Sequence, residues 1–260
     1  MIILNIKGSI HRNVKIKNNR MKLNNKPFFN MPTGFYSHDA KFLVAVDCII
    51  FGFKDKELNI LLTRRPLEPN KGEWSLMGGF MDENESVDKA AEKVLYRYTR
   101  QKGIYMEQVG AYGEIERDPG DRVVSVAYYA LVRLEEFDTS LAKAFDAKWV
   151  NIRELPKLIF DHNLMVEDAL RLLRYKVSLQ PIIFEFFHGR FTLPALQDLW
   201  EAIYQMPVDK RNFRKKIATM GILDKLNVKD KSSSKRGAFY YIFNQKKYNE
   251  FIECGNRFSL

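Results

Sequence analysis

GGFMDENESVDKAAEKVLYRYTRQKGI, the stretch from Gly78 to Ile104, contains the features that decide the fold. It opens with two glycines and a run of acidic residues, and it continues as a helical pattern. From Ser86 to about Arg100 the apolar residues recur about every 3.6 residues, the period of an α-helix, so we predict an amphipathic helix there. Its apolar stripe consists of Val87, Ala90, Ala91, Val94, Leu95 and Tyr98.

Counted from Gly79, the stretch resembles the Nudix box, G-x5-E-x7-R-E-U-x-E-E-x-G-U, in which U is a bulky aliphatic residue. In that family the box forms a loop, a helix and a second loop. Its helical glutamates share one face and hold divalent cations against a diphosphate. Gly79 and Glu85 match the box. The resemblance therefore implies a Nudix fold for the surrounding chain.

The helical half of the box departs from this pattern. Lys93 stands at the arginine position, Val94 at the next glutamate, Arg97 and Tyr98 at the glutamate pair, and Arg100 at the late glycine. A magnesium ion takes hard oxygen ligands, and valine, arginine and tyrosine offer it no carboxylate. We therefore predict an inactive hydrolase site with no catalytic residue, no metal and no cofactor.

Two other acids of the stretch, together with Glu85, allow an alternative. Glu85, Asp88 and Glu92 follow one another at intervals of three and four residues. They would therefore share a helix face, on which a shifted metal site could form. Acids at this spacing more commonly make up a solvated face, and we favour that interpretation.

The segments around the box alternate between strands and one further helix. Strands are predicted at 42–53 and 58–66 across the turn KDKE, at 108–117 and 122–132 across the turn DPGD, and at 147–155. The further helix is predicted at 163–178. Mixed strands with only two helices indicate an α-β-α sandwich of the α+β class.

Beyond Ser178 the pattern changes to that of a winged helix-turn-helix. The chain offers a helix at 192–205, a short turn, a basic helix at 210–221, a strand, the basic loop KSSSKRG at 231–237, and a strand at 238–244. This order of elements is typical of that DNA-binding motif. We place the domain boundary near residue 180, with a Nudix domain at 34–180 and a winged-helix domain at 181–260.

Composition limits the class of protein. The 260 residues are 46% hydrophobic and 28% charged, as in a globular protein rather than a disordered one. No apolar run approaches the roughly 20 residues of a membrane span. With only Cys48 and Cys254, we expect a cytoplasmic protein without a disulfide framework and without a membrane partner.

The formal net charge of +10 suggests an anionic partner, but part of it lies in an N-terminal tail. Residues 1–27 carry seven lysines and arginines and no acid. We interpret residues 1–33 as a disordered basic extension, which need not belong to the native protein. The alternative is an arm that folds on a nucleic acid backbone.

Three further stretches of sequence indicate a particular subgroup of the Nudix family. They are RDPGDRVVSVAYYAL at 117–131, LIFDHNLMVEDAL at 158–170 and VDKRNFRKKI at 208–217. Together with the altered box, they resemble the Nudix-related transcriptional regulators known as NrtR, and within them the arabinose-responsive AraR branch. The resemblance covers nearly the whole chain after about Gly34. It implies a homodimer whose Nudix domain senses a small molecule and whose C-terminal domain binds operator DNA. NrtR members respond to ADP-ribose-like ligands, and the AraR branch responds to L-arabinose.

The predicted helix at 210–221 also has the features of a DNA-recognition helix on its own terms. Phe213, Ile217 and Met220 recur at helical spacing and face a core, and Asp209 is placed as the N-cap. The other side carries lysines, arginines and an asparagine, whose side chains can reach the base edges and phosphates of DNA. The predicted DNA-binding residues are Lys210, Arg211, Asn212, Arg214, Lys215 and Lys216 on the helix, with Arg211, Asn212 and Lys215 as base-contact candidates, and Ser233, Ser234, Lys235 and Arg236 in the wing beside Lys231 and Ser232.

The alternative is a charged helix that is simply solvated. The preceding amphipathic helix, the short turn and the second basic cluster favour DNA binding.

The box, the Nudix-like phrase RRPLEPNKGEWSLMGG at 64–79 and the three stretches above also supply candidates for an effector site: Arg65, Trp74, Glu85, Arg117, Asp118, Asp161 and His162. An aromatic ring stacks on the C–H face of a sugar, while carboxylates and arginine satisfy its hydroxyls. The structural alternatives are a core position for Trp74 and a helix cap for Asp161. His162 is no metal site by itself, because the other histidines lack ligand spacing.

From these features we predict a dimeric, sugar-responsive transcriptional regulator of carbohydrate utilisation genes, with L-arabinose as the expected effector and double-stranded operator DNA as the partner. The main alternative is an active Nudix hydrolase that acts on ADP-ribose or a related nucleoside diphosphate. A third is RNA binding through the basic surface.

Overall fold

The apolar segment that begins at Phe42 forms the central strand of the main sheet, β1 (Leu43–Lys54). It pairs with β2 (Glu57–Arg64) in an antiparallel hairpin and with β6 (Val123–Arg133) in parallel. β5 (Tyr105–Tyr112) adds to the far side of β6. Within the described residues the sheet has seven strands, completed by β3 (Trp74–Ser75), β4 (Met77–Phe80) and β7 (Ala147–Asn151).

The structure is a computed structural model that describes residues 36, 38–134, 144–187, 189–231 and 236–260. The predicted tail at 1–33 and the wing residues 232–235 lie outside the described residues. Residues Phe42 to Leu260 form one compact unit.

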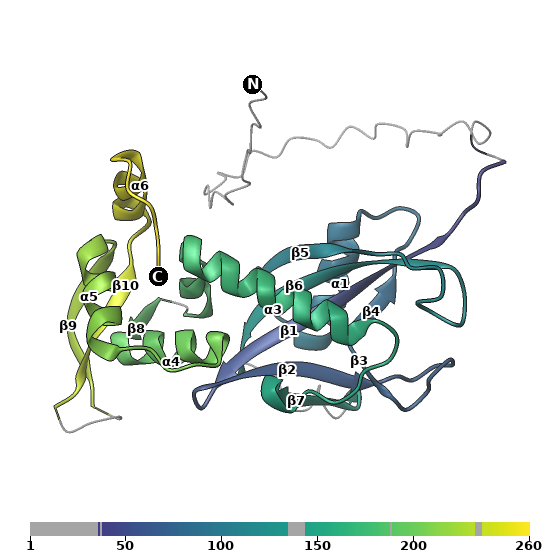
Figure 1. Cartoon of the computed structure of the whole chain (residues 1–260), viewed down its shortest axis with the longest axis horizontal. Helices are drawn as coiled ribbons and strands as arrows, with labels where there is room; N and C mark the ends of the chain where they lie inside the picture. The colour runs from purple at the N-terminus through teal and green to yellow at the C-terminus, as the bar shows by residue number, and fades with distance from the viewer. Residues whose placement is uncertain (1–35, 37, 135–143, 188, 232–235) are drawn as a thin grey trace, which may run out of the picture. The chain divides into compact units, whose positions relative to one another are not determined.

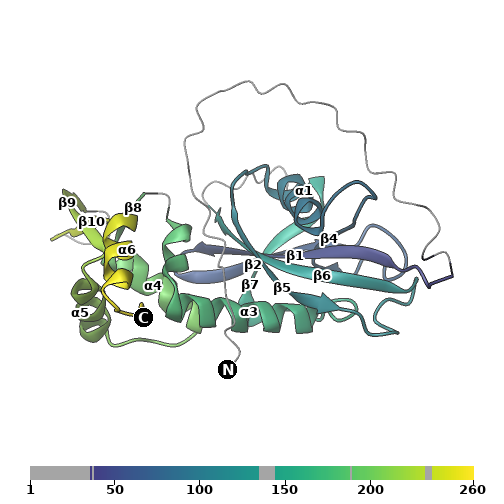
Figure 2. The same cartoon turned by 90° about the horizontal axis from the view of Figure 1, so that it is seen from above.

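The sheet is covered by one helix on each face (Figures 1 and 2). Alternate side chains of a strand point to opposite faces, so β1 contributes to two cores. Val46, Cys48 and Ile50 pack beneath α1 (Val87–Thr99), whereas Ile49 and Phe51 belong to the core on the side of α3 (His162–Leu179). The predicted α-β-α sandwich is confirmed.

The helix α1 agrees closely with its predicted bounds because its ends are specified locally. The Ser86 side chain accepts a hydrogen bond from the Lys89 N–H and caps the N-terminus, and Arg100 ends the helix in the left-handed conformation. Ala90, Ala91, Val94 and Leu95 are buried, as the apolar stripe predicted.

Two predicted strands are too long. β5 ends at Tyr112, so Arg117 lies in a loop rather than in a strand, and residues 113–122 replace the tight DPGD turn. The Arg117 side chain is drawn into a buried ion pair with Asp161, which takes the chain away from the sheet. β7 ends at Asn151, after which Ile152–Glu154 form a 3-10 turn, η2. The short strands β3 and β4 had not been predicted.

The C-terminal part folds as the predicted winged helix. It contains η3 (Pro181–Phe186), β8 (Arg190–Thr192), α4 (Leu193–Tyr204), α5 (Lys210–Met220), β9 (Leu223–Asp230), β10 (Ala238–Phe243) and α6 (Gln245–Glu253). The described part of its sheet has the order β8-β10-β9. The strand β8 and the helix α6 had not been predicted.

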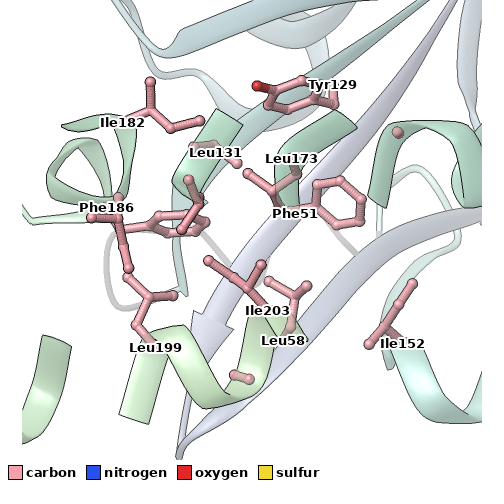
Figure 3. Close-up of a cluster of buried hydrophobic side chains, with 14 of the residues drawn as sticks. Phe51, Leu58, Tyr129, Leu131, Ile152, Leu173, Ile182, Phe186, Leu199 and Ile203 are labelled. Atoms are coloured by element: carbon pink, nitrogen blue, oxygen red, sulfur yellow. The ribbon is translucent and has the colours of Figure 1, made fainter. Parts of the chain in front are cut away.

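The hydrophobic core on the α3 side continues into the winged helix. Figure 3 shows Leu199 and Ile203 of α4 in the same cluster as Leu58 of β2 and Leu173 of α3. From α4 the cluster reaches Phe213 and Ile217 of α5. Burial of these side chains therefore stabilises both predicted domains together. Among the helices that the structure describes, none is both long and apolar enough to cross a membrane.

Candidate functional site

Lys93 of α1 bridges two acids of the loop that precedes the helix. Lys93 Nζ lies 2.7 Å from Asp82 Oδ2 and 2.6 Å from Glu85 Oε1, and the same Glu85 oxygen accepts a hydrogen bond of 2.8 Å from the Asp82 N–H. The hydrogen bond from Lys93 lowers the pKa of Asp82. Glu85 is thereby committed to the loop that leads into α1.

Other side chains stand at the positions where the Nudix box has its helical glutamates. Val94 is only 5% exposed and packs against Gly79, where an added Cβ would lie 3.2 Å from Val94 Cγ2. Tyr98 is half-buried, and its ring lies 4.8 Å from that of Phe145, centroid to centroid. Arg97 is exposed. Val94 and Tyr98 thus extend the apolar face.

The three acids that could form a shifted metal site bind separate partners. Asp88 accepts a hydrogen bond from the Tyr128 hydroxyl at 2.5 Å, and Glu92 pairs with Lys89 at 2.5 Å. Glu85 is bound by Lys93. Among the residues that the structure describes, no group of three or more histidines, cysteines and carboxylates is arranged to hold a metal ion.

A buried polar cluster lies on the opposite face of the sheet, at the start of α3. Arg117 donates two hydrogen bonds to Asp161, from Nε to Oδ2 at 2.9 Å and from Nη2 to Oδ1 at 2.7 Å. Arg117 Nη2 also lies 3.8 Å from Asp47 Oδ2, which accepts a hydrogen bond of 2.5 Å from the Ser125 hydroxyl. Arg117, Asp47 and Ser125 are all buried. A buried charge is costly unless it is paired, and this arrangement pairs each one.

His162 completes this cluster as a neutral side chain. Its Nδ1 accepts a hydrogen bond of 3.2 Å from the Leu76 N–H, and its Nε2 lies 3.7 Å from Asp47 Oδ2. Burial lowers the pKa of His162, although Asp47 and Asp161 oppose this shift. His162 therefore ties Leu76, which lies between β3 and β4, to the start of α3.

Arginines and aromatic rings surround the cluster. The Arg64 guanidinium lies 3.8 Å from the centre of the Trp74 ring, and the Arg65 guanidinium lies 5.0 Å from that of Phe160. Phe160 in turn meets the edge of the His162 ring at 5.6 Å. Guanidinium groups and aromatic faces are suited to anionic and ring-bearing ligands respectively.

Six of the seven predicted effector residues gather at this place. Arg117, Asp161 and His162 form its buried part, with Arg65, Trp74 and Asp118 around them. Glu85 does not join them, because it is bound to Lys93 beside α1. Asp161 stands at the N-cap of α3, but its side chain makes no cap hydrogen bond because Arg117 holds it.

Sequence reasoning missed Asp47, Ser125 and Phe160. Asp47 and Ser125 had a detectable signal, since each is a polar residue inside an apolar strand and such residues are buried only with a partner. Phe160 carried no such signal, because an aromatic residue in the connection before a helix is ordinary.

The second candidate site is the helix α5. The Asp209 side chain accepts a hydrogen bond of 2.7 Å from the Asn212 N–H, so the predicted cap is present. Phe213 and Ile217 are buried, and Met220 is partly buried. The predicted DNA-binding residues of this helix are all exposed: Lys210, Arg211, Asn212, Arg214, Lys215 and Lys216.

Two of these side chains have partners within the domain. Arg214 Nη2 lies 3.4 Å from Gln197 Oε1 of α4, and Lys216 Nζ lies 3.3 Å from Ser259 Oγ. In the part of the wing that the structure describes, Arg236 is exposed. The predicted wing residues Ser233, Ser234 and Lys235 lie outside the described residues.

A Nudix sandwich with an altered box, joined to a winged helix, defines a class of two-domain regulators. Two family models match the chain in this order. The model of the NUDIX domain matches residues 41–169, and that of the NrtR DNA-binding winged helix domain matches residues 183–243. The chain belongs to the NrtR family of Nudix-related regulators.

Two relatives match the chain over different lengths, a repressor over most of it and a hydrolase over about half. The ADPR responsive transcriptional repressor NtrR of Acinetobacter baylyi is 29% identical over 80% of this chain and 84% of its own length. The ADP-ribose pyrophosphatase of Methanocaldococcus jannaschii is 33% identical over 52% of this chain and 76% of its own length.

The fold agrees with a solved member of the family. The crystal structure of Shewanella oneidensis NrtR complexed with a 27mer DNA has a TM-score of 0.71 and 28% identity, over 83% of this chain and 97% of that chain. A second crystal structure of Shewanella oneidensis NrtR has a TM-score of 0.69 and 28% identity, over 83% of this chain and 98% of that chain. The similarity spans both the Nudix part and the winged helix.

Proposed function

We propose that the chain is a cytoplasmic, DNA-binding transcriptional repressor whose Nudix domain binds an effector without hydrolysing it. The observation that carries the proposal is the exposed basic face of α5, on a winged helix whose core is continuous with that of the Nudix sheet.

The recognition surface is the solvent side of α5. Arg211, Asn212 and Lys215 would contact base edges in the major groove, where arginine pairs with guanine and asparagine with adenine. Lys210, Arg214 and Lys216 would contact phosphates, and the helix N-terminus at Asp209 adds N–H groups for a further phosphate. The complex of the Shewanella NrtR with DNA supports this role.

The proposed effector is ADP-ribose or a close analogue. The names of both relatives refer to this molecule, as a regulatory signal in one and as a substrate in the other. Arg64 and Arg65 beside Trp74 and Phe160 suit a ligand with a diphosphate and a base. Neither relative supports L-arabinose as the effector or control of carbohydrate utilisation genes. L-arabinose is the competing ligand in the binding experiment below.

The absence of hydrolysis is a further part of the proposal. It is supported by the buried Val94 and the half-buried Tyr98 at two former glutamate positions, and by Arg97, which places a positive charge at the third. Without carboxylates on this face, α1 lacks the hard ligands for Mg²⁺. The competing hypothesis is an active hydrolase that recruits Glu85.

The protein would act as a homodimer on a near-palindromic operator, because two winged helices related by a two-fold axis read two half-sites. An effector that binds one arrangement of the domains more tightly than the other would shift the dimer between them.

Fluorescence anisotropy with duplex DNA from the region upstream of the protein's own gene tests the proposal. We expect binding to the duplex, a dissociation constant that changes at least fivefold with saturating ADP-ribose, and no change with L-arabinose. RNA of the same sequence should bind more weakly. If no duplex is bound at moderate salt, the repressor hypothesis is wrong.

Chromatography of ADP-ribose after incubation with the protein and Mg²⁺ or Mn²⁺ tests the catalytic part separately. We expect intact ADP-ribose. Turnover that disappears in Glu85→Gln would establish the hydrolase instead.

A further inference from the structure

The helix α3 connects the two candidate sites. Its first residues lie in the buried polar cluster, where Asp161 is held by Arg117 and His162 by the Leu76 N–H. Its 18 residues correspond to a rod of about 27 Å at about 1.5 Å per residue. Lys176 near its end pairs with Glu107 of β5 at 2.6 Å. The last two turns contact the winged helix.

Arg174 makes the polar contact with the end of α4. Its Nε donates to the Ile203 carbonyl at 2.9 Å, and its Nη2 donates to Gln205 Oε1 at 3.1 Å. In return the Tyr204 hydroxyl donates to the Arg174 carbonyl at 2.7 Å. The last carbonyls of a helix have no partner within it and carry partial negative charge, so an arginine there is favourable.

This contact lies at the turn of the helix-turn-helix. Gln205 is the left-handed residue that ends α4, and α5 begins at Lys210 after a short connection. Tyr204 stacks on Trp200 with ring centres 4.1 Å apart, and Trp200 meets the buried Phe213 of α5 edge-on at 6.0 Å. A continuous set of packed side chains therefore leads from Arg174 to the recognition helix.

The other side of α4 is held differently. A cavity of about 450 Å³ separates the β1–β2 turn and η2 from α4 and the start of α5; it is lined by Glu57, Arg153, Glu201 and Lys210, among others. The ion pair of Lys56 and Asp198, 3.3 Å apart, spans this region, and the Lys56 side chain is 74% exposed. An exposed ion pair of this kind contributes little to stability, because water screens its charges. On this side α4 is also held by its apolar residues Leu199 and Ile203, which share a cluster with Leu58 of β2, whereas the polar contacts that fix the end of α4 come from Arg174.

We infer that Arg174 is the positioning residue through which α3 sets the helix-turn-helix, so that a ligand-dependent shift at the start of α3 reaches α5. The inference rests on the proposed function, because it names how the effector site acts on the DNA-binding surface. A ligand that competes with Asp161 for Arg117 would release the first turn of α3. Since a helix moves as a rigid body, its far end would carry the Ile203 and Gln205 contacts with it.

The test compares Arg174→Gln with Arg171→Gln. Arg171 lies one turn earlier on the same helix, is 76% exposed and pairs with Asp168 of its own helix, so its replacement removes the same charge without touching α4. For each protein the dissociation constant for the operator duplex is measured with and without saturating ADP-ribose, and ADP-ribose binding is measured by calorimetry without DNA.

We expect both variants to bind ADP-ribose within about twofold of the unaltered protein. The effect of ADP-ribose on DNA affinity should persist in Arg171→Gln and fall to less than twofold in Arg174→Gln. Arg174→Lys, which can reach one of the two acceptors, should retain part of the effect. The deciding quantity is the ratio of the dissociation constants for the operator with and without ADP-ribose. If Arg174 had a purely structural role, Arg174→Gln would lower the stability of the protein and leave this ratio unchanged.

An unchanged ratio in Arg174→Gln, or an equal loss in both variants, overturns the inference while the proposed function stands. If the unaltered protein binds ADP-ribose and DNA and neither affects the binding of the other, both the inference and the proposed function are wrong. If Arg174→Gln does not fold, Tyr204→Phe takes its place. It removes only the hydroxyl bond to the Arg174 carbonyl, and it must reduce the ratio for the inference to hold.

Discussion

Gly78 lies directly against Asp47: a Cβ added at Gly78 would lie 2.4 Å from Asp47 Oδ1. The two residues face each other across the β1–β4 pair. The next residue, Gly79, faces the other side of the sheet, where an added Cβ would meet Val94 of α1 at 3.2 Å. The two glycines of the deciding stretch therefore make room for the buried polar cluster on one face and for α1 on the other.

Gly78→Ala should destabilise the protein. The Asp47 carboxylate cannot retreat freely, because Ser125 holds its second oxygen and Arg117 lies beside it. Overpacking of this kind costs roughly 1–3 kcal/mol. The free energy of unfolding from urea denaturation measures the loss. Gly110→Ala is the control, since nothing lies within 4 Å of an added Cβ there. Equal stability of the two variants would contradict the tight contact.

His162 should make the protein less stable in mild acid. Burial lowers its pKa below the ordinary value of 6.5, so the unfolded chain takes up a proton that the folded chain does not. Well above pH 6.5, titration of His162 therefore does not affect the free energy of unfolding. As the pH falls from about 6.5 towards the lowered pKa, this free energy decreases. Melting temperatures between pH 7.5 and 5.5 measure this loss.

His162→Asn serves as the matched variant, because its side-chain oxygen can accept the Leu76 N–H but does not titrate. It should show a smaller decrease in melting temperature over the same pH range. The same decrease as in the unaltered protein would show that other groups are responsible.

Restoring the first missing glutamate should harm the fold. Val94→Glu would bury an unpaired carboxylate among the apolar residues under α1, at a cost on the order of 3 kcal/mol. Arg97→Glu changes an exposed position of the same helix and should alter the free energy of unfolding by about 0.5 kcal/mol or less. Chemical denaturation of both variants checks this difference. A fully stable Val94→Glu would indicate that this face is more open than the structure shows.

Substitutions at two residues of α5 should distinguish contacts that read the base sequence from contacts that depend only on charge. Arg211→Ala should cost roughly 1–3 kcal/mol on the operator and relax the preference for it over random DNA. Lys216→Ala should weaken binding to both kinds of DNA alike. It should also reduce the slope of log affinity against log salt concentration by about the amount that one phosphate contact contributes. Anisotropy titrations at several salt concentrations measure both effects. Identical behaviour of the two variants would argue against their separate roles.

The helices could be predicted closely from local sequence. The bounds of α1, α3, α4 and α5 agree with the predicted ones within one or two residues. This accuracy has a physical reason: helical hydrogen bonds join residues four apart, and Ser86, Thr192 and Asp209 cap their helices with their own side chains. The strands β3 and β4 escaped prediction because two to four residues are too few for a periodic pattern.

The sequence by itself determined the order of elements, the apolar face of α1 with Val94 and Tyr98 in it, and the basic face of α5. Each of these depends on residues that are neighbours along the chain. Only the tertiary structure decided that Arg117, Asp161, Asp47 and His162 form one buried cluster and that Glu85 stays outside it. These residues come from a loop, a helix start and a strand, and the parallel register of β1 with β6 and the packing of α3 bring them together. Because such pairing depends on the sheet as a whole, no local pattern contains it.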